Sequence, residues 1–185
     1  AVRAAFQNLR GFDVVVLTDG DGTYPAEEAP RLIAPILEGR ADMTVGLRRP
    51  VPGAQAMAPV RALGNVLIGG AFRVLVGPGT SDLLSGYRAF SRKFVEAADL
   101  RSEGFEIETE LAVTATARPW PTVEIDVPYH PRIAGSESKL RAFRDGRRIL
   151  ATIIREGFRL RPWRAVVVFA ALTAAGGGFV YLIAR

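Results

Sequence analysis

The residues best suited to chemistry are two carboxylates, Asp19 and Asp21, in the stretch VVVLTDGDGT. The apolar run at 13–17 predicts a strand buried on both faces, so the two acids directly follow its carboxyl end. Open α/β sheets bind ligands at that end of their strands. Acids at spacing two, with a glycine after each, leave space for a hard divalent cation and for phosphate oxygens, which Mg²⁺ or Mn²⁺ prefers. The alternative is a structural turn rich in aspartate.

A phosphatase is an alternative for the same residues. The segment Asp19–Thr23 also matches the Asp-x-Asp-Gly-Thr pattern of haloacid-dehalogenase-like phosphatases, in which the first Asp is the nucleophile and the second the general acid. Such enzymes also need a later lysine and a late acidic pair at a strand end. Lys139, in a serine-rich stretch, fits that lysine poorly, and no acidic pair follows. The phosphatase therefore remains the second hypothesis.

A second candidate cluster is SDLLSGYRAF at 81–90. We expect Asp82 near the start of a helix, where free N–H groups and the helix dipole favour a carboxylate. Arg88 is then placed to bind a phosphate or to pair with Asp82. The alternative is a simple helix cap with an ion pair.

The segment GFEIETEL at 104–111 carries Glu106, Glu108 and Glu110 on an otherwise apolar predicted helix. Three acids so spaced cannot all face the core, so we expect at least one to face a cleft.

A cationic segment, YHPRIAGSESKL, occupies residues 129–140. Its side chains suit the binding of a phosphate group, because arginine and lysine pair with phosphate oxygens. The polar members are Arg132, Ser136, Ser138 and Lys139. The alternative is a solvated basic loop.

The charge distribution and the C-terminal segment point to a membrane. Residues 1–130 carry 13 Lys and Arg against 16 Asp and Glu, whereas residues 131–185 carry 11 against 3. The segment 165–184 has no charge, and twenty helical residues span about 30 Å, one hydrocarbon core. Because arginines precede this segment more densely than they follow it, we expect the body of the protein on the cytoplasmic side. A buried C-terminal helix is the alternative.

Composition removes several other classes of function. The chain of 185 residues has no cysteine and one histidine, which excludes disulfide scaffolds, thiol nucleophiles and multi-histidine metal centres. Nucleic-acid binding is disfavoured, because the basic region adjoins the apolar segment and lacks interleaved stacking aromatics.

The order of predicted elements indicates an α/β fold with a largely parallel sheet and flanking helices. Strands are expected at 13–17, 41–47 and 122–129. Helices are expected at 1–11, 26–39, 60–77, 81–98 after an initial turn, 105–118, and over most of 131–164.

These motifs, in this order, resemble family 2 glycosyltransferases, specifically the dolichol-phosphate mannose synthases and bacterial polyprenyl-phosphate glycosyltransferases. The resemblance lies in DGDGTYP at 19–25, VGLR at 45–48, GN at 64–65, DLLSGYRAF at 82–90, GFEIETEL at 104–111 and RIAGSESKL at 132–140. It implies a GT-A fold, which is Rossmann-like, and inverting transfer of a sugar from a nucleotide-diphosphate sugar to a polyprenyl phosphate. It also implies an enzyme of cell-envelope glycan synthesis at the inner cell membrane.

The resemblance assigns roles to the candidate residues. Asp19 and Asp21 match the family's DxD motif and would hold Mg²⁺ or Mn²⁺ and the donor diphosphate, which Arg48 would also face. Asp82 would be the base or would orient the acceptor phosphate, with Glu108 as the alternative. The acceptor phosphate would be bound by Arg88, Arg132, Ser136, Ser138 and Lys139.

The chain departs from the family in two places. The family often has Gln at the position of Thr23, which puts a third metal ligand in doubt. The family's first strand, which contacts the nucleotide base, has no counterpart, so we expect an N-terminally truncated GT-A domain at 1–150, a basic membrane-proximal helix at 151–164 and a transmembrane helix at 165–184. A catalytically inactive, membrane-anchored fragment is therefore a further alternative.

Overall fold

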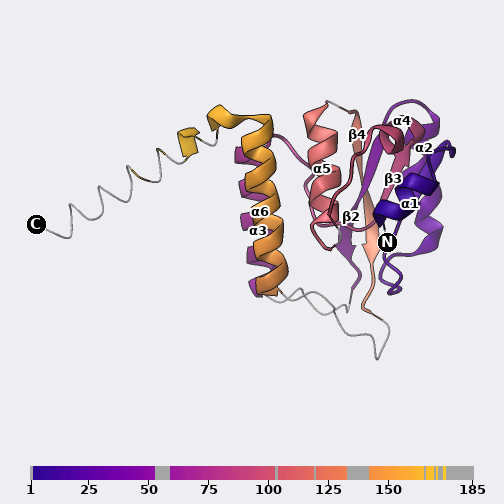
Figure 1. The fold of residues 1–185 in the computed structure, drawn as a ribbon. Helices are drawn as coiled ribbons and strands as arrows, with labels where there is room; N and C mark the ends of the chain where they lie inside the picture. Colours follow the sequence, from indigo (N-terminus) through magenta and orange to yellow (C-terminus); the bar gives the residue numbers. More distant parts are fainter. Residues whose placement is uncertain are drawn as a thin grey trace, which may run out of the picture.

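The computed structural model describes residues 2–52, 59–102, 104–118, 120–132, 142–164, 166–168, 170 and 173. They form a four-stranded sheet with helices on both faces (Figure 1). The strands are β1 (Val14–Leu17), β2 (Met43–Pro50), β3 (Arg88–Ser91) and β4 (Thr122–Tyr129). The helices are α1 (Val2–Asn8), the 3-10 turn η1 (Ala26–Glu28), α2 (Ala29–Leu37), α3 (Pro59–Leu75), α4 (Arg92–Ala97), α5 (Ile107–Ala117) and α6 (Ala142–Leu160).

The helices pack in layers set by three apolar clusters. On one face of the sheet, α2 packs through Leu32 and Ile36. On the other face lie α1, α4 and α5, with Leu111 of α5 fully buried. Further out, α3 and α6 pack on α5 through Phe72 and Ile153. The α3 and α6 pair thus forms an outer layer on one side of the molecule (Figure 1).

The sheet is mixed and not mainly parallel in its pairing, which corrects the sequence-based expectation. The strand order is β1-β3-β2-β4, and β3 runs antiparallel to both of its neighbours, β1 and β2. Only β2 and β4 pair in parallel, from Met43 opposite Thr122 to Pro50 opposite Tyr129. Consequently β1, β2 and β4 run in one direction, and β3 begins at the edge of the sheet where they end.

The source of this correction is the segment 81–98, which we expected to be helical after its first turn. It instead forms β3 and then the short helix α4. All four residues of β3 are buried, and Ala89 and Phe90 point into the cores on opposite faces of the sheet. The hydroxyl of Ser91 accepts a hydrogen bond from the Phe94 amide at 3.2 Å and so caps α4. A four-residue strand fixed by pairing on both edges leaves little local signal.

The other expected elements match the structure closely, including the basic helix α6. Among the described residues, no helix is both long and apolar enough to cross a membrane. Most of the segment 165–184, where we expected such a helix, lies outside the described residues.

Candidate functional site

The candidate site lies at the edge of the sheet where β1, β2 and β4 end. The segment 18–24 leaves β1 there, and the amide of His130, just after β4, donates a hydrogen bond to the Thr23 carbonyl at 2.9 Å. Because β3 is antiparallel, the loop 82–87 that precedes it reaches the same edge. The antiparallel strand thus brings the loop 82–87 beside Asp19 and Asp21.

Asp21 is held in place before any ligand binds. Its Oδ1 accepts hydrogen bonds from the Thr23 amide at 3.2 Å and from the Thr23 hydroxyl at 2.6 Å. Its Oδ2 forms an ion pair with Nε of Arg132 at 2.9 Å. Thr23 is buried and bonded to Asp21, so its role here is to orient the carboxylate.

Asp19 lies against the backbone of Gly86. A Cβ atom built on Gly86 would stand 2.6 Å from Oδ1 of Asp19, so only glycine leaves the carboxylate where it is. Burial raises the pKa of Asp19, and the neighbouring Asp21 raises it further, against the opposing effect of Arg48 and Arg132. A cation bound between the two carboxylates would favour the ionised form of Asp19 and offset its repulsion from Asp21.

A divalent cation fits this pair of acids. No group of three or more metal-binding side chains occurs in the described part of the chain. Two carboxylates are nevertheless sufficient for Mg²⁺, which is typically bound by one or two of them together with substrate phosphates and waters. Asp19 and Asp21 are therefore the residues that would hold the ion.

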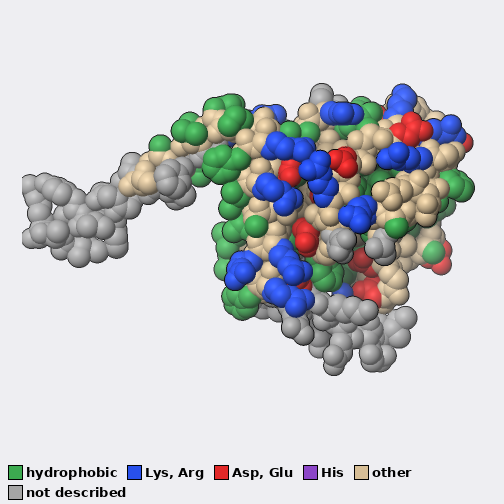
Figure 2. Space-filling view, viewed as in Figure 1, with side chains coloured by type: hydrophobic (Ala, Val, Ile, Leu, Met, Phe, Trp, Pro, Cys, Tyr) green, Lys and Arg blue, Asp and Glu red, His purple; other side chains and the backbone are tan. Residues whose placement is uncertain are grey.

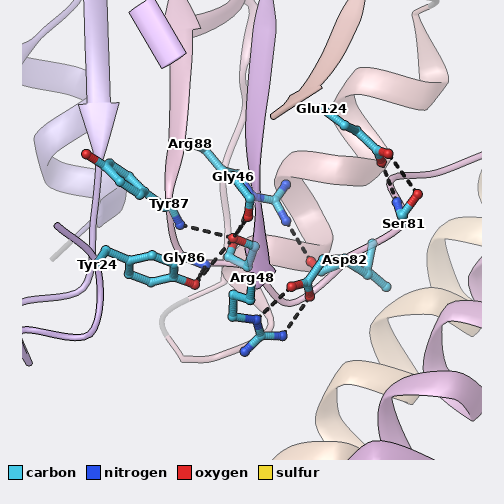
Figure 3. A network of polar contacts seen from close by, with 11 residues as sticks. Tyr24, Gly46, Arg48, Ser81, Asp82, Gly86, Tyr87, Arg88 and Glu124 are labelled. Atoms are coloured by element: carbon cyan, nitrogen blue, oxygen red, sulfur yellow. Dashed lines mark hydrogen bonds and ion pairs between the residues drawn. The ribbon is translucent and has the colours of Figure 1, made fainter. Parts of the chain in front are cut away.

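Arg48 and Asp82 form a two-bond ion pair beside these acids (Figure 3). Nε and Nη2 of Arg48 donate to the two carboxylate oxygens at 2.7 and 2.6 Å. The guanidinium also lies over the Tyr129 ring, 5.6 Å from its centroid. Burial alone would lower the pKa of Arg48, but the hydrogen bonds and charge of Asp82 outweigh it and raise the pKa above its ordinary value. Asp82 precedes β3 in a turn, not at a helix start as we expected.

A hydroxyl network supports the loop 82–87, and sequence reasoning missed it. The Ser85 hydroxyl donates to the Gly46 carbonyl at 2.6 Å and lies 3.3 Å from the Tyr24 hydroxyl. The Gly86 amide donates to the Tyr24 hydroxyl, also at 3.3 Å. Burial raises the pKa of Tyr24 to about 12, so it stays a neutral hydroxyl. Tyr24 lies in the motif DGDGTYP and Ser85 in the motif DLLSGYRAF. Their position beside the charged candidate residues was the signal in the sequence that could have identified them.

Arg88 lies elsewhere than expected for a phosphate ligand. The side chain is fully buried, and burial lowers its pKa. Its Nε and Nη2 donate to the carbonyls of Ser85 at 2.9 Å and Leu83 at 2.6 Å. A residue with no exposed surface and these partners holds the loop in place and does not reach an acceptor phosphate.

The three glutamates near the start of α5 separate into different environments. Glu110 is buried and accepts from the Arg101 and Ser102 amides, which closes the preceding loop. Glu106 has a buried Oε2 without a hydrogen-bond partner. Burial raises the pKa of the half-buried Glu108 to about 7, against the opposing charge of Arg88. The negative charge of Asp19 also raises the pKa of Glu108, so the two carboxyl groups lie near the same edge of the sheet.

The cationic segment is described only in part. Arg132 is placed beside Asp21, as given above. Ser136, Ser138 and Lys139 lie outside the described residues.

The mixed sheet with its flanking helices resembles the fold of GT-A glycosyltransferases. Glucosyl-3-phosphoglycerate synthase from Mycobacterium tuberculosis, solved in complex with Mg²⁺ and uridine diphosphate, superimposes with a TM-score of 0.59. The match covers 83% of this chain and 53% of that one, at 22% identity, so it concerns the fold alone. No protein-family profile matches the chain.

Curated relatives lead to the same class of enzyme. Glycosyltransferase AglJ of Haloferax volcanii is 37% identical over 186 residues, which is the whole of this chain and 61% of the relative. Polyprenol monophosphomannose synthase of Mycolicibacterium smegmatis is 32% identical over 130 residues, covering 68% of this chain and 49% of the relative. The chain thus spans about half to three-fifths of these relatives. Its homologues are glycosyltransferases, which confirms the resemblance read from the motifs.

Proposed function

We propose that this chain is the catalytic part of a membrane-bound, inverting glycosyltransferase. Its donor is a nucleotide-diphosphate sugar, and its acceptor is a polyprenyl phosphate such as dolichyl or undecaprenyl phosphate. The observation that carries the proposal is the edge of the sheet at which Asp19 and Asp21 stand beside Arg132 and the Arg48–Asp82 pair. Two anionic phosphate groups can meet there only if cations flank them.

The donor diphosphate is assigned to Asp19, Asp21 and Arg48. Asp19 and Asp21 would hold Mg²⁺ or Mn²⁺, which would supply positive charge to the leaving diphosphate. Arg48 is already aligned by both oxygens of Asp82, so its guanidinium is fixed near the position of that charge. Fixed positive charge at a leaving group is more effective than charge that must reorient during the reaction.

The acceptor phosphate is assigned to Arg132, Ser136, Ser138 and Lys139. The new bond joins a phosphate oxygen to the anomeric carbon, and the nucleoside diphosphate leaves from the opposite face. A phosphate monoester is already anionic near neutral pH, so it needs orientation more than deprotonation. When one proton remains on it, Glu108 accepts that proton. Asp82 serves as a positioning residue, because both of its oxygens bind Arg48.

We further propose that the enzyme acts at the cytoplasmic face of the inner cell membrane. The apolar segment 165–184 supports a membrane location, and the arginines before it support this orientation. A phosphatase that uses Asp19 as nucleophile is the weaker hypothesis, because the curated relatives are glycosyltransferases.

The test is the transfer of radiolabelled sugar into organic-extractable lipid. Membranes that carry the chain are incubated with UDP- or GDP-sugars, polyprenyl phosphate and Mg²⁺ or Mn²⁺. We expect metal-dependent label in the lipid phase, lost with EDTA and with Asp19→Asn. The same assay is repeated on a form extended at the N-terminus. Label formed only by the extended form would mean that transfer needs residues beyond this chain and that the proposed function is correct. Absence of lipid label in both forms would refute the proposal.

A further inference from the structure

The segment that leads from α3 to Asp82 borders a cavity. After α3 ends at Leu75, residues 78–81 run toward the candidate site outside any helix or strand. They line one side of a cavity of about 660 Å³, whose other walls include residues of β2, β4 and α5. Because the cavity lies on this side of the segment, packed side chains do not fix its position there. Its position therefore depends on polar contacts.

Two side-chain contacts hold this segment in the described part of the chain. At its start, the Thr116 hydroxyl lies 3.3 Å from the Pro78 carbonyl, and the same hydroxyl also donates within α5 at 2.9 Å. At its end, the amide and the hydroxyl of Ser81 donate to the two carboxylate oxygens of Glu124, the hydroxyl at 2.7 Å (Figure 3). Paired hydrogen bonds to an ionised carboxylate are the stronger kind, so Glu124 provides the main attachment.

Glu124 reaches this segment from the edge of the sheet. It stands on β4, which pairs with β2 alone, and it lies opposite Val45. Its neighbours Val123 and Ile125 pack in the cluster on the α2 side of the sheet. Because side chains alternate along a strand, Glu124 points to the other face, where it lines the cavity with Ser81.

The attachment of Ser81 is passed on to Arg48 through one residue. Asp82 follows Ser81 directly, and its two oxygens accept from Nε and Nη2 of Arg48 at 2.7 and 2.6 Å. On the other side of Asp82, the buried Arg88 holds the loop by donating to two of its carbonyls. Glu124 thus secures the loop before Asp82, and Arg88 secures it after Asp82.

We propose that Glu124 is a positioning residue for Arg48. By holding Ser81, it keeps Asp82 where both carboxylate oxygens meet the guanidinium. A shift of about 1 Å would disturb this two-bond geometry, and displacements of that size are sufficient to slow an enzyme strongly. The inference rests on the proposed function, in which Arg48 faces the donor diphosphate, and it adds a residue of the edge strand that touches neither substrate.

The test compares variants of the full chain at position 124. Glu124→Thr favours a strand but is too short to reach Ser81. Glu124→Gln keeps the contact, because its carbonyl accepts from the Ser81 amide and its NH₂ group donates to the hydroxyl. Asp126→Asn is the matched control, since Asp126 is an exposed carboxylate of the same strand that pairs with the exposed Arg49. Ser81→Ala removes one of the two bonds without altering the strand.

The primary measurement is hydrogen exchange at Nε of Arg48 by nuclear magnetic resonance, with the signal assigned by its loss in Arg48→Lys. We expect exchange at least about five-fold faster in Glu124→Thr, because the proton is protected only while Asp82 accepts it. Ser81→Ala should give an intermediate rate, and Glu124→Gln and Asp126→Asn should keep the rate of the parent chain. Unchanged exchange in both Glu124→Thr and Ser81→Ala would overturn the proposal.

Sugar transfer gives the second measurement. We expect Glu124→Thr to lower kcat at least about five-fold, and to cause no further loss in an Arg48→Lys background, because the two changes then remove the same effect. An equal loss in both backgrounds would mean that Glu124 acts on stability alone and would also overturn the proposal. If the parent chain transfers no sugar while Arg48 exchange still responds to Glu124→Thr, the proposed function fails and the positioning role stands.

Discussion

At the scale of single residues, the candidate site is a set of opposite charges held at fixed positions. Asp21 is oriented by Thr23 and paired with Arg132, and Arg48 is aligned by Asp82. The motif DGDGT was sufficient to locate the acids from the sequence. The ion pairs were not predictable, because Arg48 and Asp82 are 34 residues apart and meet only when β3 forms.

Asp21→Asn tests the acidic pair. We expect sugar transfer to fall by at least about 100-fold, because the cation loses a carboxylate and Arg132 loses its ion-pair partner. Asp126→Asn is the matched control, since Asp126 is exposed and pairs with the exposed Arg49. Comparable activity of the two variants, with both folded by circular dichroism, would contradict a role of Asp21 in the site.

Gly86→Ala tests the close contact with Asp19. The added methyl group would stand 2.6 Å from the carboxylate oxygen, so Asp19 must move. We expect about a ten-fold or greater loss of transfer, and a higher metal concentration for half-maximal rate. Gly11→Ala should leave both quantities unchanged, because a Cβ there meets nothing within 4 Å. An unaltered metal requirement in Gly86→Ala would count against this geometry.

The titration of Glu108 predicts two pH effects. Burial raises its pKa from 4.5 to about 7, so the folded chain binds the proton more tightly than the unfolded chain does. The free energy of unfolding should therefore fall as pH rises from about 4.5 to about 7. Glu108→Gln should remove this fall and give a higher Tm than the parent chain at pH 8.

The catalytic pH effect has the opposite sign. The proposed acceptance of a proton requires ionised Glu108, so the rate should rise with pH through about 7 and should lose part of that rise in Glu108→Gln. A parallel pH–rate profile in the variant, with only the Tm altered, would reduce Glu108 to a structural residue.

At the scale of elements, β3 decides where the site lies. Periodicity predicted the helices and the strands β1, β2 and β4, because each is long enough, or apolar enough, to leave a local signal. The strand β3 gave no local signal in the sequence, because its four residues are fixed by backbone pairing to strands 40 or more residues away in the chain. The expected helix at Asp82 was wrong for this reason.

Arg88→Met tests how β3 and its preceding loop are held. Without the guanidinium, the buried carbonyls of Leu83 and Ser85 lose their donors, so we expect the free energy of unfolding to fall by about 3 kcal/mol. Arg92→Met is the matched control, because Arg92 is half exposed and pairs with an exposed Asp13. It should cost about 0.5 kcal/mol by urea denaturation. Equal losses would show that Arg88 does not hold the loop.

At the scale of the whole molecule, the candidate site and the α3 and α6 pair lie in different layers of one fold. Asp19 and Asp21 lie at the edge of the sheet, whereas α6 carries five arginines, and Lys and Arg side chains are seen over this helix (Figure 2). The sequence showed the positive charge of α6 as part of the net positive region after residue 130.

The central claim, transfer of a sugar to a lipid phosphate, is tested most directly by the product itself. Purified protein in vesicles receives an α-linked nucleotide-diphosphate sugar, divalent metal, and either polyprenyl phosphate or the matching polyprenol without phosphate. Mass spectrometry and nuclear magnetic resonance then identify the new bond and its anomeric configuration. We predict a β-linked sugar on the phosphate, with no product from polyprenol. A retained α configuration, equal use of polyprenol, or release of inorganic phosphate in place of a sugar product would contradict the account.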